Sequence, residues 1–215
     1  MRKIKISPGE YYHIYNRENK RQPIFFDNRD RIRFLLLVLY FQSPIRIHNI
    51  SDYVTEYTKH SVFGLAKIKE IVASRYVELT IFALMRNHFH LGLKETQEGG
   101  IARYMQKILN AYTKYFNTKY KTSGHLFQGP YQAVHIENNT QLLHLSSYIH
   151  KNPKKIKEWS TKIDKYPWSS YQDYVKENRW GELLIKDIIA EQFKSKKDYR
   201  KFINTSTAKE KVCGA

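Results

Sequence analysis

The feature that most constrains the fold is a long apolar stretch at helical spacing in the middle of the chain. Its members recur every three or four positions over more than four turns: Ile101, Tyr104, Met105, Ile108, Leu109, Tyr112, Tyr115 and Phe116. Gly99 and Gly100 precede the stretch, and Gly124 follows it. The spacing predicts one long helix, closed by Gly124, against which the other elements must be arranged.

Strand patterns lie on both sides of this helix. Residues 11–16 are rich in β-formers and follow a Pro-Gly turn. Residues 77–85 and 88–94 are dense in apolar and β-branched side chains, and only Arg86 and Asn87 separate them, which predicts a hairpin. A fourth strand is expected over 126–136.

Shorter helices complete the pattern. Asp27 can cap a helix that Pro44 ends, and Asn139 or Thr140 can cap a helix that Pro153 stops. Residues 51–74 suggest one or two more short helices, within an inserted segment of about 44–75.

The order strand, helix, strand, strand, helix, strand, helix predicts an α+β fold. We expect an antiparallel sheet with helices packed on one face, related to the ferredoxin-like arrangement. Residues 1–175 would form one catalytic domain, in which 166–171 is a docked loop. Residues 176–215 would form a C-terminal helical tail.

The charge of the chain indicates its partner. Lys and Arg number 37 against 20 Asp and Glu, so the net charge is +17. Self-repulsion at this charge favours a polyanionic partner, and nucleic acid is the leading one. The longest apolar run, 34–41, is too short to span a bilayer, and the basic N-terminus lacks the apolar core of a secretory signal. We therefore expect a cytoplasmic protein.

The sharpest local motif is His88-Phe89-His90. Side chains alternate along a strand, so the two imidazoles should project from one face while Phe89 points into the core. Two imidazoles at this spacing can share one metal ion and leave positions for a substrate phosphate. The pattern alone is weakly specific, because nine histidines in 215 residues could place two of them at this spacing by chance.

The helix before Pro153 offers candidates for a third ligand and for a nucleophile. Tyr148 and Asn152 are four residues apart, so they lie on the same helix face about one turn from each other. Because a residue before proline is pushed away from helical geometry, the direction of the Asn152 side chain is left open by the sequence.

Several motifs in the same order resemble a known family. They are Tyr12-His13-Ile14-Tyr15-Asn16-Arg17, Asn87-His88-Phe89-His90-Leu91, Tyr115-Phe116-Asn117 at the end of the long helix, Gly124-His125-Leu126-Phe127-Gln128-Gly129, Tyr148-Ile149-His150-Lys151-Asn152-Pro153 and Trp168-Ser169-Ser170-Tyr171. Together they resemble the REP-associated tyrosine transposases, which are IS200-like, single-tyrosine HUH enzymes. The resemblance covers residues 10–175, and segments 44–75 and 176–215 depart from it.

This resemblance implies a chemistry. His88 and His90 would hold Mg²⁺ or Mn²⁺, with Asn152 at the position of the third ligand. Tyr148 would attack a DNA phosphodiester, leaving a 5′-phosphotyrosine and a free 3′-hydroxyl, and covalent storage of the bond energy would allow rejoining without ATP. The family acts on single-stranded or hairpin DNA, and a monomer or a homodimer would serve.

Polar and basic residues near these motifs are candidates for DNA contacts. They are Asn16, Arg17, Arg21, Arg86, Gln128, Lys151 and Lys154, with Lys155 beside them. For any one of the basic residues, a solvated surface position is the competing interpretation.

Two other functions remain open at this point. A non-catalytic protein with this fold could bind single-stranded nucleic acid through exposed aromatic and basic side chains. A metal-dependent nuclease could use water as the attacking group. The binding protein would leave His88, His90 and Tyr148 without a common purpose, so we prefer the enzyme. Trapping a covalent protein–DNA adduct would separate tyrosine chemistry from the nuclease.

Overall fold

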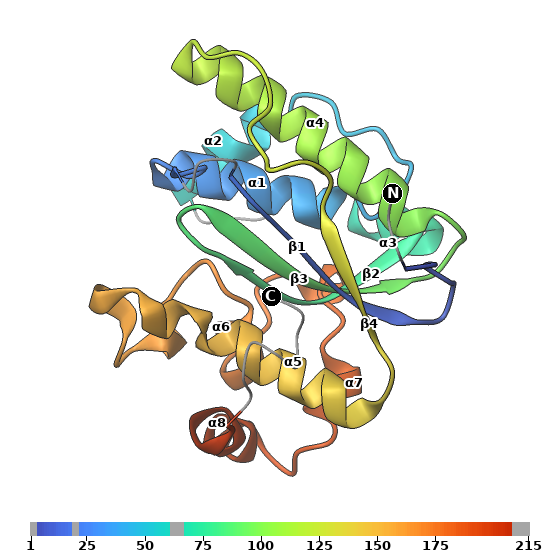
Figure 1. Ribbon diagram of the computed structural model, residues 1–215, viewed down its shortest axis with the longest axis vertical. Helices are drawn as coiled ribbons and strands as arrows, with labels where there is room; N and C mark the ends of the chain where they lie inside the picture. Colours follow the sequence, from blue (N-terminus) through green and yellow to red (C-terminus); the bar gives the residue numbers. More distant parts are fainter. Residues whose placement is uncertain (1–3, 19–21, 61–66, 208–215) are drawn as a thin grey trace.

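The computed structural model describes residues 4–18, 22–60 and 67–207. Figure 1 shows a four-stranded sheet between two layers of helices. The strands are β1 (Tyr11–Arg17), β2 (Val77–Leu84), β3 (His88–Glu95) and β4 (Gln132–Ile136). The α-helices are α1 (Asn28–Tyr40), α2 (Ile50–His60), α3 (Ile68–Ser74), α4 (Gly100–Tyr120), α5 (Asn139–Lys151), α6 (Tyr171–Val175), α7 (Asp187–Ala190) and α8 (Lys196–Thr205). Short 3₁₀ helices span Asn152–Lys155, Lys157–Trp159, Ile163–Lys165 and Gly181–Leu183.

The sheet has the strand order β2-β3-β1-β4, and every neighbouring pair is antiparallel. The chain order β1, α1, β2, β3, α4, β4 is that of a ferredoxin-like unit, with α2 and α3 added after α1. The predicted α+β class is therefore confirmed. β1 and β3 are the two central strands, and their register pairs Tyr15 with His90.

Helices cover both faces of the sheet, whereas the sequence suggested one. The helices that connect strands, α1 and α4, share one face as expected, but α5, α6 and α8 lie on the other (Figure 1). The cause is visible in β2, where Phe82 and Leu84 are buried in the core under α1 and α4, while Ile81 and Ala83 are buried in the core under α5. A strand that is apolar on both faces needs cover on both.

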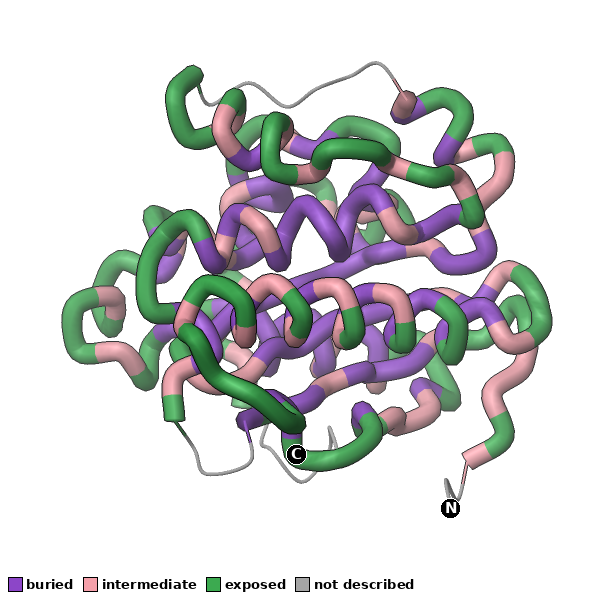
Figure 2. The backbone as a smooth tube through the Cα atoms, turned by 90° about the horizontal axis from the view of Figure 1, so that it is seen from above, coloured by how far each residue is buried: buried purple, intermediate pink, exposed green. Residues whose placement is uncertain are grey.

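The buried residues run through the middle of the molecule, between outward-facing helix turns that are exposed (Figure 2). Local signals fix the position of α1 within this arrangement. Asp27 caps α1, and a capping box with Asp30 completes its first turn. Asp30 is itself buried and accepts hydrogen bonds from Lys119, Tyr115 and Tyr120, which ties the start of α1 to the end of α4.

Several boundaries differ from the predicted ones. α4 ends at Tyr120, because Lys121 already has left-handed backbone (φ 53°), and Gly124 comes later. The fourth strand begins at Gln132 rather than at 126, because Gly129 (φ 69°) and the following proline turn the chain. Before that turn, Phe127 makes only an isolated bridge to Glu18.

Both ends of α5 also differ from the predicted ones. Asn138, one residue before the two predicted caps, accepts the hydrogen bond from Gln141 N and caps the helix. Pro153 does not stop the helical path, since the chain continues as a 3₁₀ helix over Asn152–Lys155. Asn152 keeps right-handed helical backbone (φ −50°, ψ −40°) despite the proline that follows it.

The segments outside the ferredoxin-like unit pack onto it. α2 and α3 are the short helices expected within 51–74, and residues 61–66 lie outside the described part of the chain. The loop before α6 docks as predicted, because Ser169 bridges to Ala83 and Ser170 N donates to Phe82 O.

Residues after 175 contribute to both cores. Trp180 and Leu183 join the core under α1 and α4, while Tyr199 and Ile203 join the core under α5. A domain boundary at 175 stays a prediction, as does a cytoplasmic location. Within the described residues, none of the helices has the length and apolar character needed to cross a bilayer.

Candidate active site

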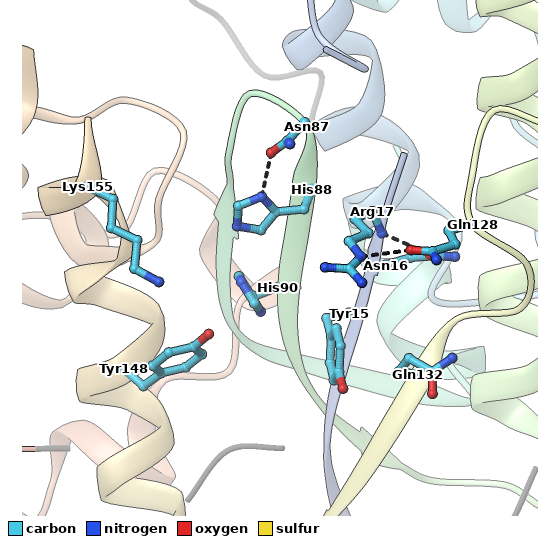
Figure 3. A pocket seen from close by; sticks show the side chains of 10 residues that line it. All are labelled: Tyr15, Asn16, Arg17, Asn87, His88, His90, Gln128, Gln132, Tyr148 and Lys155. Carbon is cyan, nitrogen blue, oxygen red and sulfur yellow. Dashed lines mark hydrogen bonds between the residues drawn. The ribbon is translucent and has the colours of Figure 1, made fainter. Parts of the chain in front are cut away.

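A cleft of about 590 Å³ opens where β1 and β3 face the C-terminal half of α5. Its lining comes from four parts of the chain, as Figure 3 shows. The lining residues are Tyr15, Asn16, Arg17, Asn87, His88, His90, Gln128, Gln132, Tyr148 and Lys155. Seven of them are residues that the sequence placed in the site: His88, His90, Tyr148, Asn16, Arg17, Gln128 and Lys155.

His88 and His90 project into the cleft from the first and third positions of β3. Their ring centroids are 5.0 Å apart and the ring planes are nearly perpendicular. Phe89, between them, is fully buried in the opposite core, where its ring contacts those of Phe34 and Phe127. The strand alternation thus places the two imidazoles and the Phe89 ring on opposite faces of the sheet, as the sequence predicts.

Each of the two imidazoles is held through its Nδ1 atom. His88 Nδ1 donates to Asn87 Oδ1 at 2.8 Å, and His90 Nδ1 lies 2.9 Å from Nε2 of His13. His90 is only 3% exposed, and this burial, together with the nearby His13, His88 and Lys155, holds its pKa well below the ordinary value. His90 is therefore a neutral imidazole at neutral pH, which is the form that binds metal ions.

Tyr148 reaches the same cleft from α5, on the other side of the histidines from Arg17 (Figure 3). Its ring stands edge-on to His90, with centroids 5.4 Å apart and an interplanar angle of 80°. Lys155 Nζ lies 5.8 Å from the centre of the Tyr148 ring. One phenol, two imidazoles and an ammonium group therefore meet at one place.

The orientation of α5 is set by contacts on its far side. His150 is fully buried, with Nδ1 2.7 Å from the Tyr199 hydroxyl and Nε2 2.8 Å from Ser170 Oγ. These bonds join α5 to α8 and to the docked loop. A helix fixed in this way holds Tyr148 in a constant position relative to β3.

Asn152, the predicted third ligand, lies one turn after Tyr148 but does not line the cleft. It is 2% exposed, and its Nδ2 donates to Tyr148 O at 3.4 Å. Its Oδ1 is buried and has no hydrogen-bond partner in the described part of the chain. A buried amide oxygen without a partner is costly, and a cation is one group that would satisfy it.

The donor set fits a divalent cation that is held loosely. Across residues 4–18, 22–60 and 67–207, no three His, Cys, Asp or Glu side chains converge as a metal site. The candidate ligands are therefore two imidazoles and an amide oxygen, and oxygen atoms of a substrate would complete the coordination. Such a mixed nitrogen and oxygen set suits Mn²⁺ or Mg²⁺ and leaves open positions for a phosphate.

Polar residues joined by hydrogen bonds form the rim of the cleft across from Tyr148. Arg17 Nε donates to Gln128 Oε1, and Gln128 N donates to Arg17 O, both at 2.8 Å. Asn16 Nδ2 donates to Gly129 O at 3.2 Å. The turn at Gly129 therefore brings the segment before β4 against the end of β1 and holds the Arg17 guanidinium at the cleft.

Other predicted DNA contacts are not part of the cleft lining. Arg86 and Lys154 are exposed but do not line it, and Lys151 Nζ donates to Ser206 O. Arg21 lies outside the described residues.

Sequence reasoning missed Tyr15, Asn87 and Gln132 as lining residues, and His13 behind them. The signal was present in β1, because alternation along a strand puts His13, Tyr15 and Arg17 on one face. What the sequence could not supply was the register that pairs Tyr15 with His90.

Comparison with known proteins identifies the family of this chain. The family model described as IS200-like transposase matches residues 8–152, a span that contains the cleft histidines and Tyr148. The chain belongs to the IS200-like transposase family. Transposases cut and rejoin DNA, so membership implies a DNA-cleaving and rejoining enzyme.

A solved structure shares the fold of this transposase. It is the REP-associated tyrosine transposase bound to a REP hairpin, with a TM-score of 0.53 and 15% sequence identity. The match covers 87% of this chain and 92% of that one. A search of curated proteins returned no match.

Proposed function

We propose that this transposase cleaves and rejoins single-stranded DNA next to a hairpin, with Tyr148 as the nucleophile. The observation that carries the proposal is the meeting of Tyr148 with His88 and His90 in one cleft, where the Tyr148 ring stands 5.4 Å from that of His90. A phenol, a pair of imidazoles and nearby cationic side chains are what a tyrosine-mediated phosphoryl transfer requires.

His88, His90 and Asn152 are the residues that would hold Mg²⁺ or Mn²⁺. When bound, such an ion supplies positive charge to the non-bridging and leaving oxygens of the scissile phosphate. His88 and His90 each have Nδ1 engaged in a hydrogen bond, so Nε2 is the atom that each would direct to the ion. The buried Oδ1 of Asn152, which has no hydrogen-bond partner in the described part of the chain, would supply the third ligand atom.

Tyr148 would attack the phosphorus through its phenol oxygen. The phenol proton leaves to solvent, a bond from the Tyr148 oxygen to phosphorus forms, and the bond from phosphorus to the 3′ oxygen breaks. That oxygen takes up a proton and becomes a free 3′-hydroxyl, while the 5′ phosphate stays on Tyr148. The reverse attack by a 3′-hydroxyl restores the phosphodiester without a further energy source.

Cationic side chains on both sides of the cleft would hold the DNA strand. Arg17 and Lys155 line opposite sides of the cleft, so a phosphodiester lying between Tyr148 and the histidines would have positive charge on both flanks (Figure 3). Tyr15 and Gln132 offer a stacking ring and a polar amide to a base beside the phosphate.

The substrate class follows from the fold neighbour and from charge. The REP-associated enzyme is described as bound to a REP hairpin, and we extend a hairpin substrate to this chain. A net charge of +17 suits a folded DNA strand, which concentrates phosphates. A monomer or a homodimer would serve this function.

The test uses a pool of DNA hairpins with randomised single-stranded flanks, labelled at the 3′ end, incubated with Mn²⁺. We expect a label that runs with the protein under denaturing conditions and is released by protease. The 5′ fragment, labelled separately, should be extended by a polymerase because it ends in a 3′-hydroxyl. Tyr148→Phe should form no adduct. Tyr11→Phe removes the hydroxyl of a half-buried tyrosine that lies outside the cleft lining, and it should behave as the parent protein.

Two results would replace this proposal. Cleavage without an adduct would make water the attacking group, and the protein would be a metal-dependent nuclease. Tight hairpin binding without any cleavage in Mg²⁺ or Mn²⁺ would make it a binding protein on the transposase fold.

A further inference from the structure

His13 is a buried imidazole behind the cleft that the proposed chemistry does not use. It lies on β1, where its register partner is Gly92, two residues beyond His90 on β3. His13 and His90 are therefore diagonal neighbours on one face of the sheet. Their rings are near parallel, with an interplanar angle of 25° and centroids 5.1 Å apart, and His13 Nε2 lies 2.9 Å from His90 Nδ1.

At this distance one proton lies between the two nitrogens. The nitrogen to which this proton is bonded decides whether Nε2 of His90 has a lone pair for a ligand. A neutral imidazole carries one N–H and one lone pair, so the partner of one nitrogen determines the state of the other. If His13 donates, His90 carries its proton on Nε2 and offers no lone pair to a ligand. If His90 donates, its Nε2 carries the lone pair.

His88 shows which of these states the neighbouring position has. The amide oxygen of Asn87 only accepts, so His88 Nδ1 is the donor in their 2.8 Å hydrogen bond. Nε2 of His88 therefore carries the lone pair. A shared ligand needs the same state at both histidines, and this requires that His90 Nδ1 donates to His13.

We infer that His13 is a positioning residue, which accepts the Nδ1 proton of His90 and so presents the Nε2 lone pair of His90 to a divalent cation. The inference rests on the metal role given to His90 in the proposed function. Packing against two aromatic rings holds the His13 imidazole in this orientation. The Tyr15 ring is stacked 4.9 Å away, and the Tyr148 ring stands edge-on at 6.0 Å.

A neutral acceptor also suits the substrate. Imidazole ligands of metals most often donate to a carboxylate, a carbonyl or water. A carboxylate at position 13 would orient His90 but would place a negative charge behind a cleft that must admit a phosphodiester. The His13 imidazole supplies the acceptor without that charge.

The test compares three variants, with calorimetric titration of Mn²⁺ into the protein without DNA. His13→Leu removes the acceptor and should weaken Mn²⁺ binding about 10- to 100-fold, the usual effect of losing such a partner. His13→Gln keeps an acceptor oxygen and should recover most of that loss. His135→Leu removes an imidazole from β4 that is bonded to Glu10, outside the cleft, and should bind as the parent protein does.

A second measurement reads the tautomer directly. In ¹⁵N-edited NMR spectra of the metal-free parent protein, His90 should show a proton on Nδ1 and none on Nε2. This NMR measurement uses the parent protein, so it does not require that a His13 variant folds. A proton on Nε2 of His90, or unchanged Mn²⁺ affinity in a folded His13→Leu protein, would overturn the inference.

The two measurements also separate this inference from the proposed function. If the parent protein binds no Mn²⁺ but His90 carries its proton on Nδ1, the result supports the hydrogen bond assigned to His13. The same result contradicts the metal role in the proposed function.

Discussion

The two faces of the central sheet are built from the same strands and have opposite properties. Under α1 and α4, β3 contributes Phe89, Leu91 and Leu93 to a continuous apolar core. Toward α5, the same strand and β1 contribute His88, His90 and His13, and the rings of His90 and His13 contact the Tyr148 ring. Alternation by one residue thus separates the side chains that stabilise the fold from those proposed to act on DNA.

This difference shows how a chemically demanding cleft is stabilised. Buried imidazoles contribute little apolar area and must keep hydrogen-bond partners, so the cleft face is held by polar contacts. The opposite face provides apolar burial that compensates. Variants on the two faces should therefore fail in different ways.

The largest expected effect comes from the apolar face. Phe89→Ala should lower the free energy of unfolding by about 3–5 kcal/mol, because it empties a fully buried ring site packed against Phe34. His88→Ala, one residue away on the other face, should cost about 1 kcal/mol or less. Denaturant unfolding of both proteins measures the contrast, and equal losses would contradict the separation of the faces.

A smaller effect concerns the hydrogen bonds that hold α5. Burial lowers the pKa of His150 to about 3, while in the unfolded chain it is near the ordinary value of 6.5. Above pH 6.5 His150 is neutral in both the folded and the unfolded protein, so it does not make stability depend on pH. Between pH 6.5 and 3 the unfolded chain binds a proton that the folded protein does not, so stability should fall by roughly 1.4 kcal/mol per pH unit from this residue.

The measurement is denaturant unfolding at a series of pH values between 7 and 4. His150→Gln has no group to titrate at this position, so its stability should fall less steeply with acid than that of the parent. Identical slopes for the two proteins would mean that His150 is not held neutral in the fold.

The smallest effect is on the electrostatics of DNA binding. Arg17 lines the cleft, Arg86 is exposed outside its lining, and both carry one positive charge. If only Arg17 contacts a backbone phosphate, Arg17→Gln should reduce the slope of log affinity against log salt by about 0.7 for a single strand. Arg86→Gln should leave the slope unchanged. Equal changes would place the strand outside the cleft.

Periodicity alone predicted much of the fold. The stretch from Ile101 to Phe116 became α4, and the two runs on either side of Arg86 and Asn87 became the hairpin of β2 and β3. The predicted end of the long helix and the predicted start of the fourth strand were wrong, because the backbone conformation at Lys121 and at Gly129 decides them. The layer opposite α1 and α4 was missed, although β2 is buried on both faces from Leu79 to Leu84.

The site was predicted where a short motif carries it and missed where tertiary contacts assemble it. His88 and His90 follow from strand alternation, and Tyr148 from its place on a helix and from the family resemblance. Tyr15 and His13 reach the site only through the pairing of β1 with β3, which no local pattern reveals. Asn152 was expected in the cleft, but its side chain is buried beside it.

The most direct test of Tyr148 as the nucleophile is to identify the residue that becomes covalently attached to the DNA. The covalent adduct formed with a hairpin substrate would be digested with protease and nuclease, and the peptides sequenced by mass spectrometry. We expect one nucleotide attached through its 5′ phosphate to Tyr148, and no modified peptide from Tyr148→Phe. A nucleotide on Tyr15, on the other side of the same cleft, or on any other residue would contradict it.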